Sequence, residues 1–355
     1  MKAKNRQANF ELLRIIAMLM VVTMHYLMKG NVASSMAEDG SVVNLLTWFI
    51  QSACIVAVNV YVLISGYFLV TAEWKISRLL KLVLQILCYS IGVPLVCLCL
   101  GVGNVAQWSV YDWGVAIFPL QMEHYWFATA YIVLYLLVPI LSVAVQKMEK
   151  KQLQVTIGVL VLFFSVGKSI IPILIPTDRY GYDFGWFICL FLIAAYIRLY
   201  GIQFLNNTRK ALIIYLILVV TIFAYSAGLG WLTRSYGLPL SYAMDMVHCY
   251  NHILVLGASV ALFCGIRYFR IPKGNFSKIV CAVAPYTFGV YLLHENIAIR
   301  QLWQSWFGVE SVKGSFMFLP HMLITVLVVF VISIIVDYVR SIVFQVVEKL
   351  LLRFR

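Results

Sequence analysis

The sequence predicts an all-α membrane protein, a bundle of about ten transmembrane helices with both termini in the cytoplasm. Three observations support this fold class. First, 63% of the 355 residues are hydrophobic and 12% are charged, whereas a soluble domain carries about 25% charged residues. Second, ten stretches reach the length of about 20 apolar residues that crossing a bilayer requires. Third, basic residues are distributed unequally between the connecting loops.

This composition excludes a soluble enzyme, a disordered chain and a disulfide-stapled secreted domain. A soluble protein of this length could not bury so much apolar surface in one core. Most of the eight cysteines lie within apolar stretches, where we expect small lipid-facing or helix-facing residues rather than disulfide partners or metal ligands. We therefore expect one membrane domain over residues 1–355, with no separate soluble domain and no metal site.

The predicted spans follow one another with short connections. They cover approximately residues 9–28, 45–70, 80–101, 124–146, 153–174, 184–201, 210–229, 250–269, 279–299 and 320–346. The segment 104–122 contains Trp108, Tyr111 and Trp113 and is too broken to span. We expect it to be an outer loop in the aromatic belt at the membrane surface.

The formal net charge of +13 would indicate a nucleic-acid partner in a soluble protein. Here the distribution of the charges indicates membrane topology instead. With the N-terminus in the cytoplasm, the basic residues in outer segments are Lys29, Arg179, Arg234, Arg300 and Lys313, while Arg14 and Lys168 lie within spans. The remainder of the 27 basic residues lie in cytoplasmic segments, as expected for a chain whose partner is the lipid bilayer.

Two polar residues of the first span share one helix face. Arg14 and His25 are 11 residues apart, which amounts to about three turns plus about 20°, and about 16 Å along the helix axis. Glu11 precedes Arg14 by three residues and can pair with it. Because charged and imidazole groups within a bilayer are costly, they favour the bundle interior or a water-filled cavity. The alternative is a snorkelling arginine and a structural histidine.

Further histidines and carboxylates lie at the outer level of the predicted membrane, with His25. Those that could join a proton-transfer site are Glu123, His124, His294 and Glu295. For His248, His252 and His321 we expect structural roles. At the inner level, Lys75, Arg78 and Lys81 precede or begin the third span. They favour either ordinary anchoring or a clamp for the phosphates of an anionic cofactor.

Four motifs together resemble the integral-membrane acyltransferase 3 family, whose members O-acylate bacterial cell-surface glycans. The helix from Asn9 to His25 looks like the family's Arg-x10-His helix. The other three motifs lie in residues 62–68 (VLISGYF), in 124–127 (HYWF) with Tyr131 and Pro139, and in 291–294 (YLLH).

The resemblance implies that His25 is catalytic and that Arg14 is its partner along an acyl-CoA channel. The family's basic Arg-x-x-Arg pair reads Arg78-x-x-Lys81 here, and lysine lacks the bidentate fork of arginine, so the clamp would be either weaker or completed by Lys75. The implied substrates are acetyl-CoA and a cell-surface or lipid-linked polysaccharide. The implied location is the bacterial cytoplasmic membrane.

The expected reaction uses His25 as a general base toward an acceptor hydroxyl, although a transient acyl-histidine is also possible. Either Glu123 or Glu295 would orient the imidazole. The main alternative function is a transporter or flippase of a lipid-linked or glycan substrate. Against a transporter, the sequence has no inverted repeat and no paired helices broken by glycine or proline.

Overall fold

The computed structural model describes residues 6–170 and 179–353, without the side chains of 351–353. Every regular element within these residues is a helix, which confirms the all-α fold class. Eight helical stretches in the described residues are long and apolar enough to cross a membrane. The chain is therefore a multi-pass membrane protein.

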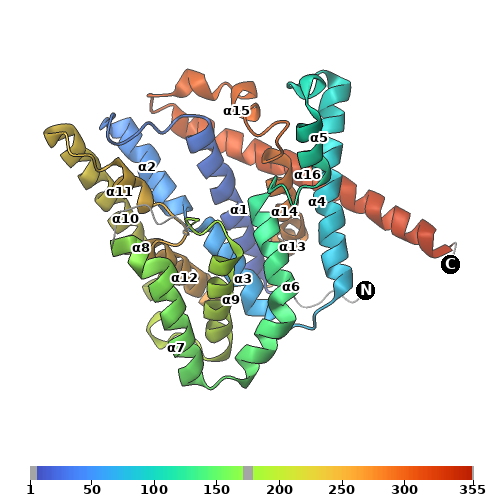
Figure 1. Ribbon diagram of the computed structural model, residues 1–355, viewed down its shortest axis with the longest axis horizontal. Coiled ribbons are helices and arrows are strands. Elements are labelled where there is room, and N and C mark those ends of the chain that lie inside the picture. Colours follow the sequence, from blue (N-terminus) through green and yellow to red (C-terminus); the bar gives the residue numbers. More distant parts are fainter. Residues whose placement is uncertain (1–5, 171–178, 354–355) are drawn as a thin grey trace.

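Five of the eight stretches lie in the first half of the chain and three in the second half, and Figure 1 shows how these helices are arranged. The first four are α1 (Ala8–Lys29), α2 with α3 (Val42–Cys54 and Ala57–Leu69), α4 (Ile76–Leu100) and α6 (Trp126–Lys147). The next is α7 (Lys150–Val161), continued by the π-turn η2 (Leu162–Val166) and α8 (Gly167–Ile170). The last three are α10 (Thr208–Tyr236), α13 to α14 (Asn275–Val283, η4 Ala284–Tyr286, Thr287–His294) and α16 (Phe318–Arg353).

The two remaining predicted spans form shorter helices. The predicted segment 184–201 forms α9 (Phe184–Leu199), and 250–269 forms α12 (Ile253–Tyr268), each of 16 residues. A helix of this length rises about 24 Å, less than the thickness of about 30 Å of a hydrocarbon core. Most residues of both helices are buried inside the protein. Their apolar sequence thus reflects protein packing as well as any contact with lipid.

The ninth predicted span, residues 279–299, ends earlier than expected. A 3₁₀ turn over Ala284–Tyr286 separates α13 from α14, and α14 ends at His294. Pro285 lies in this turn, where its missing N–H interrupts the helical hydrogen bonds. Glu295 is therefore the first residue after the helix, and the chain continues from it in turns.

The segment 104–122 does not span, as predicted. It forms the 3₁₀ turn η1 (Val105–Gln107) and the eight-residue helix α5 (Val110–Ile117). A capping box between Ser109 and Asp112 starts α5, and this helix lies beside α4. Short connections at the two ends also hold the turns η3 (Gln203–Leu205) and η5 (Val309–Val312) and the helices α11 (Ser241–Met246) and α15 (Trp303–Trp306).

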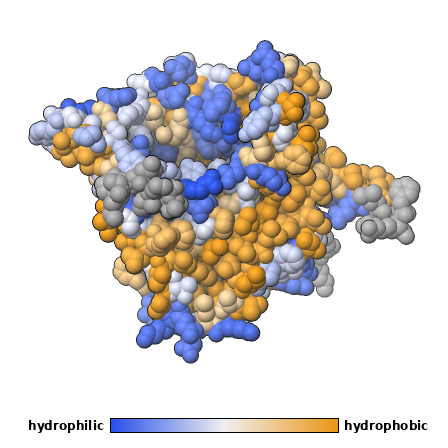
Figure 2. Space-filling model, viewed as in Figure 1, coloured by the Kyte–Doolittle hydropathy of each residue, from blue (hydrophilic) through white to orange (hydrophobic). Residues whose placement is uncertain are grey.

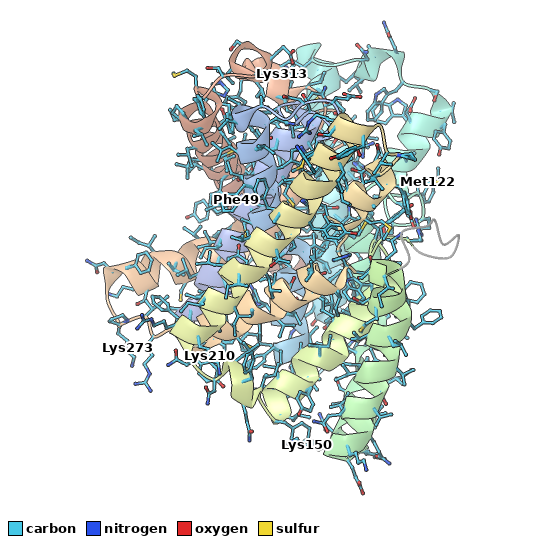
Figure 3. All side chains as sticks on the ribbon, turned by 90° about the vertical axis from the view of Figure 1, so that its left-hand side faces the viewer. Phe49, Met122, Lys150, Lys210, Lys273 and Lys313 are labelled. Carbon is cyan, nitrogen blue, oxygen red and sulfur yellow. The ribbon has the colours of Figure 1, made fainter. Side chains whose placement is uncertain are left out.

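The molecule has two polar ends with an apolar band between them (Figure 2). Lys150, Lys210 and Lys273 lie at one end and Lys313 at the other (Figure 3). The charge distribution predicts that successive connecting segments alternate between the two sides of the membrane, and the positions of these lysines agree with that prediction. The orientation of these ends toward cytoplasm and exterior stays a prediction.

Helix α1 lies at the centre of the bundle. It contacts α2, α3, α12, α13, α14 and α16, and Leu13, Val22 and Leu27 are fully buried.

Helices α3 and α9 pack closely at Gly66, which belongs to the motif in residues 62–68. A Cβ atom at Gly66 would lie 2.9 Å from Ala194 Cβ and 3.1 Å from Phe191 Cα. The two helices can approach this closely because position 66 has no side chain.

We expect the substitution Gly66→Val to lower the free energy of unfolding by about 1–3 kcal/mol, because added methyl groups in a filled contact force neighbouring atoms apart. The measurement is the melting temperature of the purified protein in detergent. Gly92→Val is the matched control, because no atom lies within 4 Å of a Cβ at Gly92 in α4. Equal melting temperatures for the two variants would contradict the packing argument.

Candidate functional site

His25 on α1 meets the end of α14. Its Nδ1 atom lies 2.9 Å from Nε2 of His294 and 3.2 Å from Oε1 of Glu295. His294 is the last residue of α14 and Glu295 follows it directly, so one helix end supplies both partners. The structure therefore brings together three of the predicted site residues, although His25 is 269 positions from His294 along the chain.

The hydrogen bonds determine where the protons lie on the two imidazoles. Nδ1 of His294 is 2.5 Å from the carbonyl oxygen of Val290, one turn earlier in α14. A carbonyl oxygen only accepts, so Nδ1 of His294 carries the proton and its Nε2 accepts. Nδ1 of His25 is then the donor to His294 and Glu295. In the neutral ring this leaves Nε2 of His25 without a proton, as a base requires.

Lys29 completes this group, although the sequence pattern alone did not identify it as a site residue. It lies one turn after His25, and its ammonium contacts Glu295 Oε1, the same oxygen that faces His25. Burial favours the neutral form of Glu295, but His25, Lys29 and His294 outweigh burial and lower the pKa of this carboxyl below its ordinary value. The carboxylate is therefore ionised. The spacing of four residues from His25 is the signal that could have identified Lys29.

Buried hydrogen bonds fix the turn that follows Glu295. The Asn296 amide donates to the Tyr125 hydroxyl at 2.9 Å. Nε2 of His124 accepts from the backbone N–H of Ile297 at 3.1 Å, and its Nδ1 is 3.0 Å from the Ser90 hydroxyl. Burial, with a contribution from Arg300, lowers the pKa of His124 to about 3, so this imidazole is neutral. His124 thus supports the site through the backbone and does not contact His25.

A small cavity of about 30 Å³ adjoins His25, enough for about two water molecules. Its walls are largely aromatic, and it lies between α1, α3, α6, α14 and the segment before α12. The lining residues are Met18, Val21, His25, Val58, Tyr61, Trp126, Phe127, Tyr250, Phe288 and Tyr291. With Nδ1 of His25 engaged, Nε2 is the ring nitrogen left to meet a substrate here. In Figure 2, hydrophilic residues surround a hollow at the end of the molecule where α1 ends.

Arg14 pairs with Glu11 as predicted, at 3.1 Å between Nη1 and Oε2. The Tyr61 hydroxyl, from the cavity wall, donates to the backbone carbonyl of Arg14 at 3.1 Å. Arg14 thus lies on α1 below the cavity, on the path from the start of this helix to His25.

Glu123 lies apart from His25. Its carboxylate receives two hydrogen bonds from the Arg179 guanidinium, the shorter at 2.8 Å, and both side chains are exposed. These bonds lower the pKa of Glu123. Of the two carboxylates considered for orienting His25, the structure places Glu295 beside it.

The basic residues before and at the start of α4 lie at the end of the molecule where α1 begins (Figure 1). Lys75 pairs with Glu73 at 2.8 Å, and Lys81 pairs with Glu348 of α16 at 3.1 Å. Arg78 donates to the Glu73 carbonyl at 3.4 Å. All three side chains are accessible from the surface, and none contacts His25.

The other histidines hold structural positions. His248 Nε2 is 3.0 Å from the Ser52 hydroxyl, and His252 caps α12 by accepting from the N–H of Leu254 at 3.3 Å. His321 bridges the Tyr26 hydroxyl and the Phe307 carbonyl, at 2.8 and 2.9 Å. None of the three joins the group around His25.

His25, His294 and Glu295 could together offer three ligands to a metal ion, since their donor atoms lie within 4.8 Å of one another. The observed geometry favours proton transfer instead. The two imidazole nitrogens are 2.9 Å apart, a hydrogen-bond distance, whereas nitrogens on one tetrahedral zinc ion lie about 3.3 Å apart. Lys29 also occupies the Glu295 oxygen that faces His25. An ammonium at that oxygen opposes a second cation there.

Comparison with known proteins identifies the family of this chain. The family model described as the acyltransferase domain (acyltransferase 3) matches residues 7–338. No curated protein and no solved structure matches the chain. The family match includes all the residues around His25 and the basic residues at α4. The chain therefore belongs to the acyltransferase 3 family and is a membrane acyltransferase.

Proposed function

We propose that this acyltransferase moves an acetyl group from acetyl-CoA, bound at the predicted cytoplasmic end, to a hydroxyl of a cell-surface or lipid-linked polysaccharide. His25 is the general base, and the protein acts in the bacterial cytoplasmic membrane. One observation carries this proposal: the bonds of Nδ1 to His294 and Glu295 leave Nε2 of His25 unprotonated where His25 lines the cavity.

In the proposed reaction, Nε2 of His25 takes the proton of the acceptor hydroxyl while the hydroxyl oxygen attacks the thioester carbon. The carbon–sulfur bond then breaks, and the imidazolium returns its proton to the departing CoA thiolate. The products are the ester and CoA with a free thiol. The reaction needs no reactant other than acetyl-CoA and the acceptor hydroxyl.

The neighbours of His25 suit this role. When Nε2 gains a proton, the positive charge of the imidazolium lies 3.2 Å from the Glu295 carboxylate, which stabilises it as the aspartate of a catalytic triad does. Lys29 holds that carboxylate in place. His294 fixes the ring orientation through its bond to Nδ1. His294 and Glu295 are thus positioning residues for His25.

The donor route is proposed to run along α1. Arg14 lies between the start of α1 and His25, and Arg78, Lys81 and Lys75 lie at the same end as the start of the helix. The ion pairs that hold Lys75 and Lys81 are exposed, and such pairs contribute only about 0–1 kcal/mol. Phosphate groups of CoA could therefore replace the carboxylates of Glu73 and Glu348 at little cost.

The cavity at His25 supports acetyl as the transferred group. A volume of about 30 Å³ suits a two-carbon acyl group better than a long chain, which would displace more of the aromatic wall. A transporter is the weaker alternative, because the family match is to an acyltransferase domain.

We expect His25→Gln to lower the rate of acyl transfer by about 10²–10⁴-fold, the usual contribution of a general base. The measurement is CoA released by purified protein from acetyl-CoA in the presence of a polysaccharide acceptor. His252→Gln is the matched control, because His252 caps α12 away from His25. Activity of the His25 variant within tenfold of the native rate would rule out this assignment.

Glu295→Gln should lower the same rate by about 10–100-fold, because the imidazolium of His25 loses its counter-charge while the side chain keeps its shape. Glu123→Gln should leave the rate within twofold, since Glu123 pairs with Arg179 at the surface. Melting temperatures of both variants report on folding. If Glu123→Gln lost activity and Glu295→Gln kept it, the two carboxylates would have the opposite roles.

A further inference from the structure

A second hollow lies where α1 begins, at the other end of this helix from His25. This surface hollow has a volume of about 470 Å³ and is open to the surroundings. Two short segments line it: Gln7 to Asn9 at the start of α1, and residues 267–271 at the end of α12. Neither segment has a part in the proposed acyl transfer.

The two segments are joined by Asn9. Its side-chain amide donates to the carbonyls of Ile266 and Arg267, both at 3.0 Å. Carbonyls in the last turn of a helix lack partners within the helix; Asn9 bonds to two of them, of which Ile266 also accepts from the backbone N–H of Phe269. The floor of the hollow is therefore already formed without any ligand.

The hollow has a strongly positive lining. The Arg267 guanidinium lies over the rings of Tyr67 and Tyr268, at 5.5 and 5.1 Å from their centres. Its Nη1 is buried and has no hydrogen-bond partner among the described residues, an unfavourable state for a charged donor. Arg270 is exposed, and no carboxylate is among the lining residues.

The start of α1 also lines the hollow. Gln7 caps this helix without a side-chain hydrogen bond, so its side chain does not satisfy the first N–H groups of α1. Free N–H groups at a helix start attract anions, phosphate in particular. Asn9 lies about 160° around α1 from His25, which separates this hollow from the catalytic face.

We propose that this hollow binds a phosphate group, either in the headgroup of an anionic phospholipid or as free phosphate. Arginine recognises phosphate by paired hydrogen bonds, and the guanidinium groups of Arg267 and Arg270, which both line the hollow, supply them here. This site is independent of the acyl-transfer proposal, because it shares no residue with the group around His25.

The test uses the full chain in phosphatidylcholine nanodiscs with two probes. In one arm, native mass spectrometry measures retention of added phosphatidylglycerol; in the other, calorimetry measures binding of inorganic phosphate. Arg267→Gln with Arg270→Gln should weaken binding at least tenfold in one arm, and that arm identifies the source of the phosphate. Lys273→Gln with Lys278→Gln is the control, because it removes the same charge outside the hollow and should change binding less than twofold.

Arg270→Gln alone tests the site without disturbing the contacts of Arg267 with the tyrosine rings, and it should weaken binding about threefold at an unchanged melting temperature. Unchanged binding in both arms for the double variant would overturn the proposal. An equal loss for the lysine control would also overturn it, because the effect would then be general charge attraction. Acyl transfer measured in parallel reports on the separate proposal for His25.

Discussion

The hydrogen bond from His294 to the carbonyl of Val290 sets the direction of the proton chain at the site. Because that carbonyl lies within α14 and only accepts, His294 presents an unprotonated Nε2 to His25. His25 then donates from Nδ1 and keeps Nε2 for chemistry. Without the Val290 bond, the His294 ring could present its proton to His25 instead, and His25 would have to accept at Nδ1. A backbone group of one helix thus determines which nitrogen of another helix is a base.

This arrangement depends on the position of α14 between α1 and α16. Gly289, one residue before Val290, faces Asp337 of α16 so closely that an added Cβ would lie 2.4 Å from the Asp337 Cβ. Asp337 is fully buried and accepts from Tyr89 at 3.0 Å and from Arg340 at 2.6 Å. The cluster neutralises a buried carboxylate and holds α14 against α16 five residues before His294. The packing of Gly289 against Asp337 therefore helps to set the position of α14 along its axis, and with it the distance between His294 and His25.

Much of the site could be predicted from the sequence because it depends on local spacing. The helix register places Arg14 and His25 on one face, and the pair of Glu11 with Arg14 follows from a separation of three residues. The choice between Glu123 and Glu295 could not be made that way, because it depends on contacts between distant segments. Arg179, which pairs with Glu123, is 56 residues away, and His25 and His294 are separated by 269 residues.

The sequence predicted where most helices lie but not whether protein or lipid surrounds them. Hydropathy identifies α4, α10 and α16 well, because much of their apolar surface faces outward. It cannot distinguish these from α9, whose residues are equally apolar because they are buried in protein. The end of α14 at His294 was also not predicted, since apolar residues such as Ile297 and Ile299 continue beyond it.

The most direct test of the central claim is the protonation of His25 itself. Solid-state ¹⁵N spectra of the histidine-labelled protein in lipid, compared with those of the His25→Gln variant, assign the two ring nitrogens of His25. At neutral pH we expect a protonated Nδ1 and an unprotonated Nε2. A spectrum with the proton on Nε2 and a free Nδ1 would contradict the account, because His25 could not then act as a base toward the cavity.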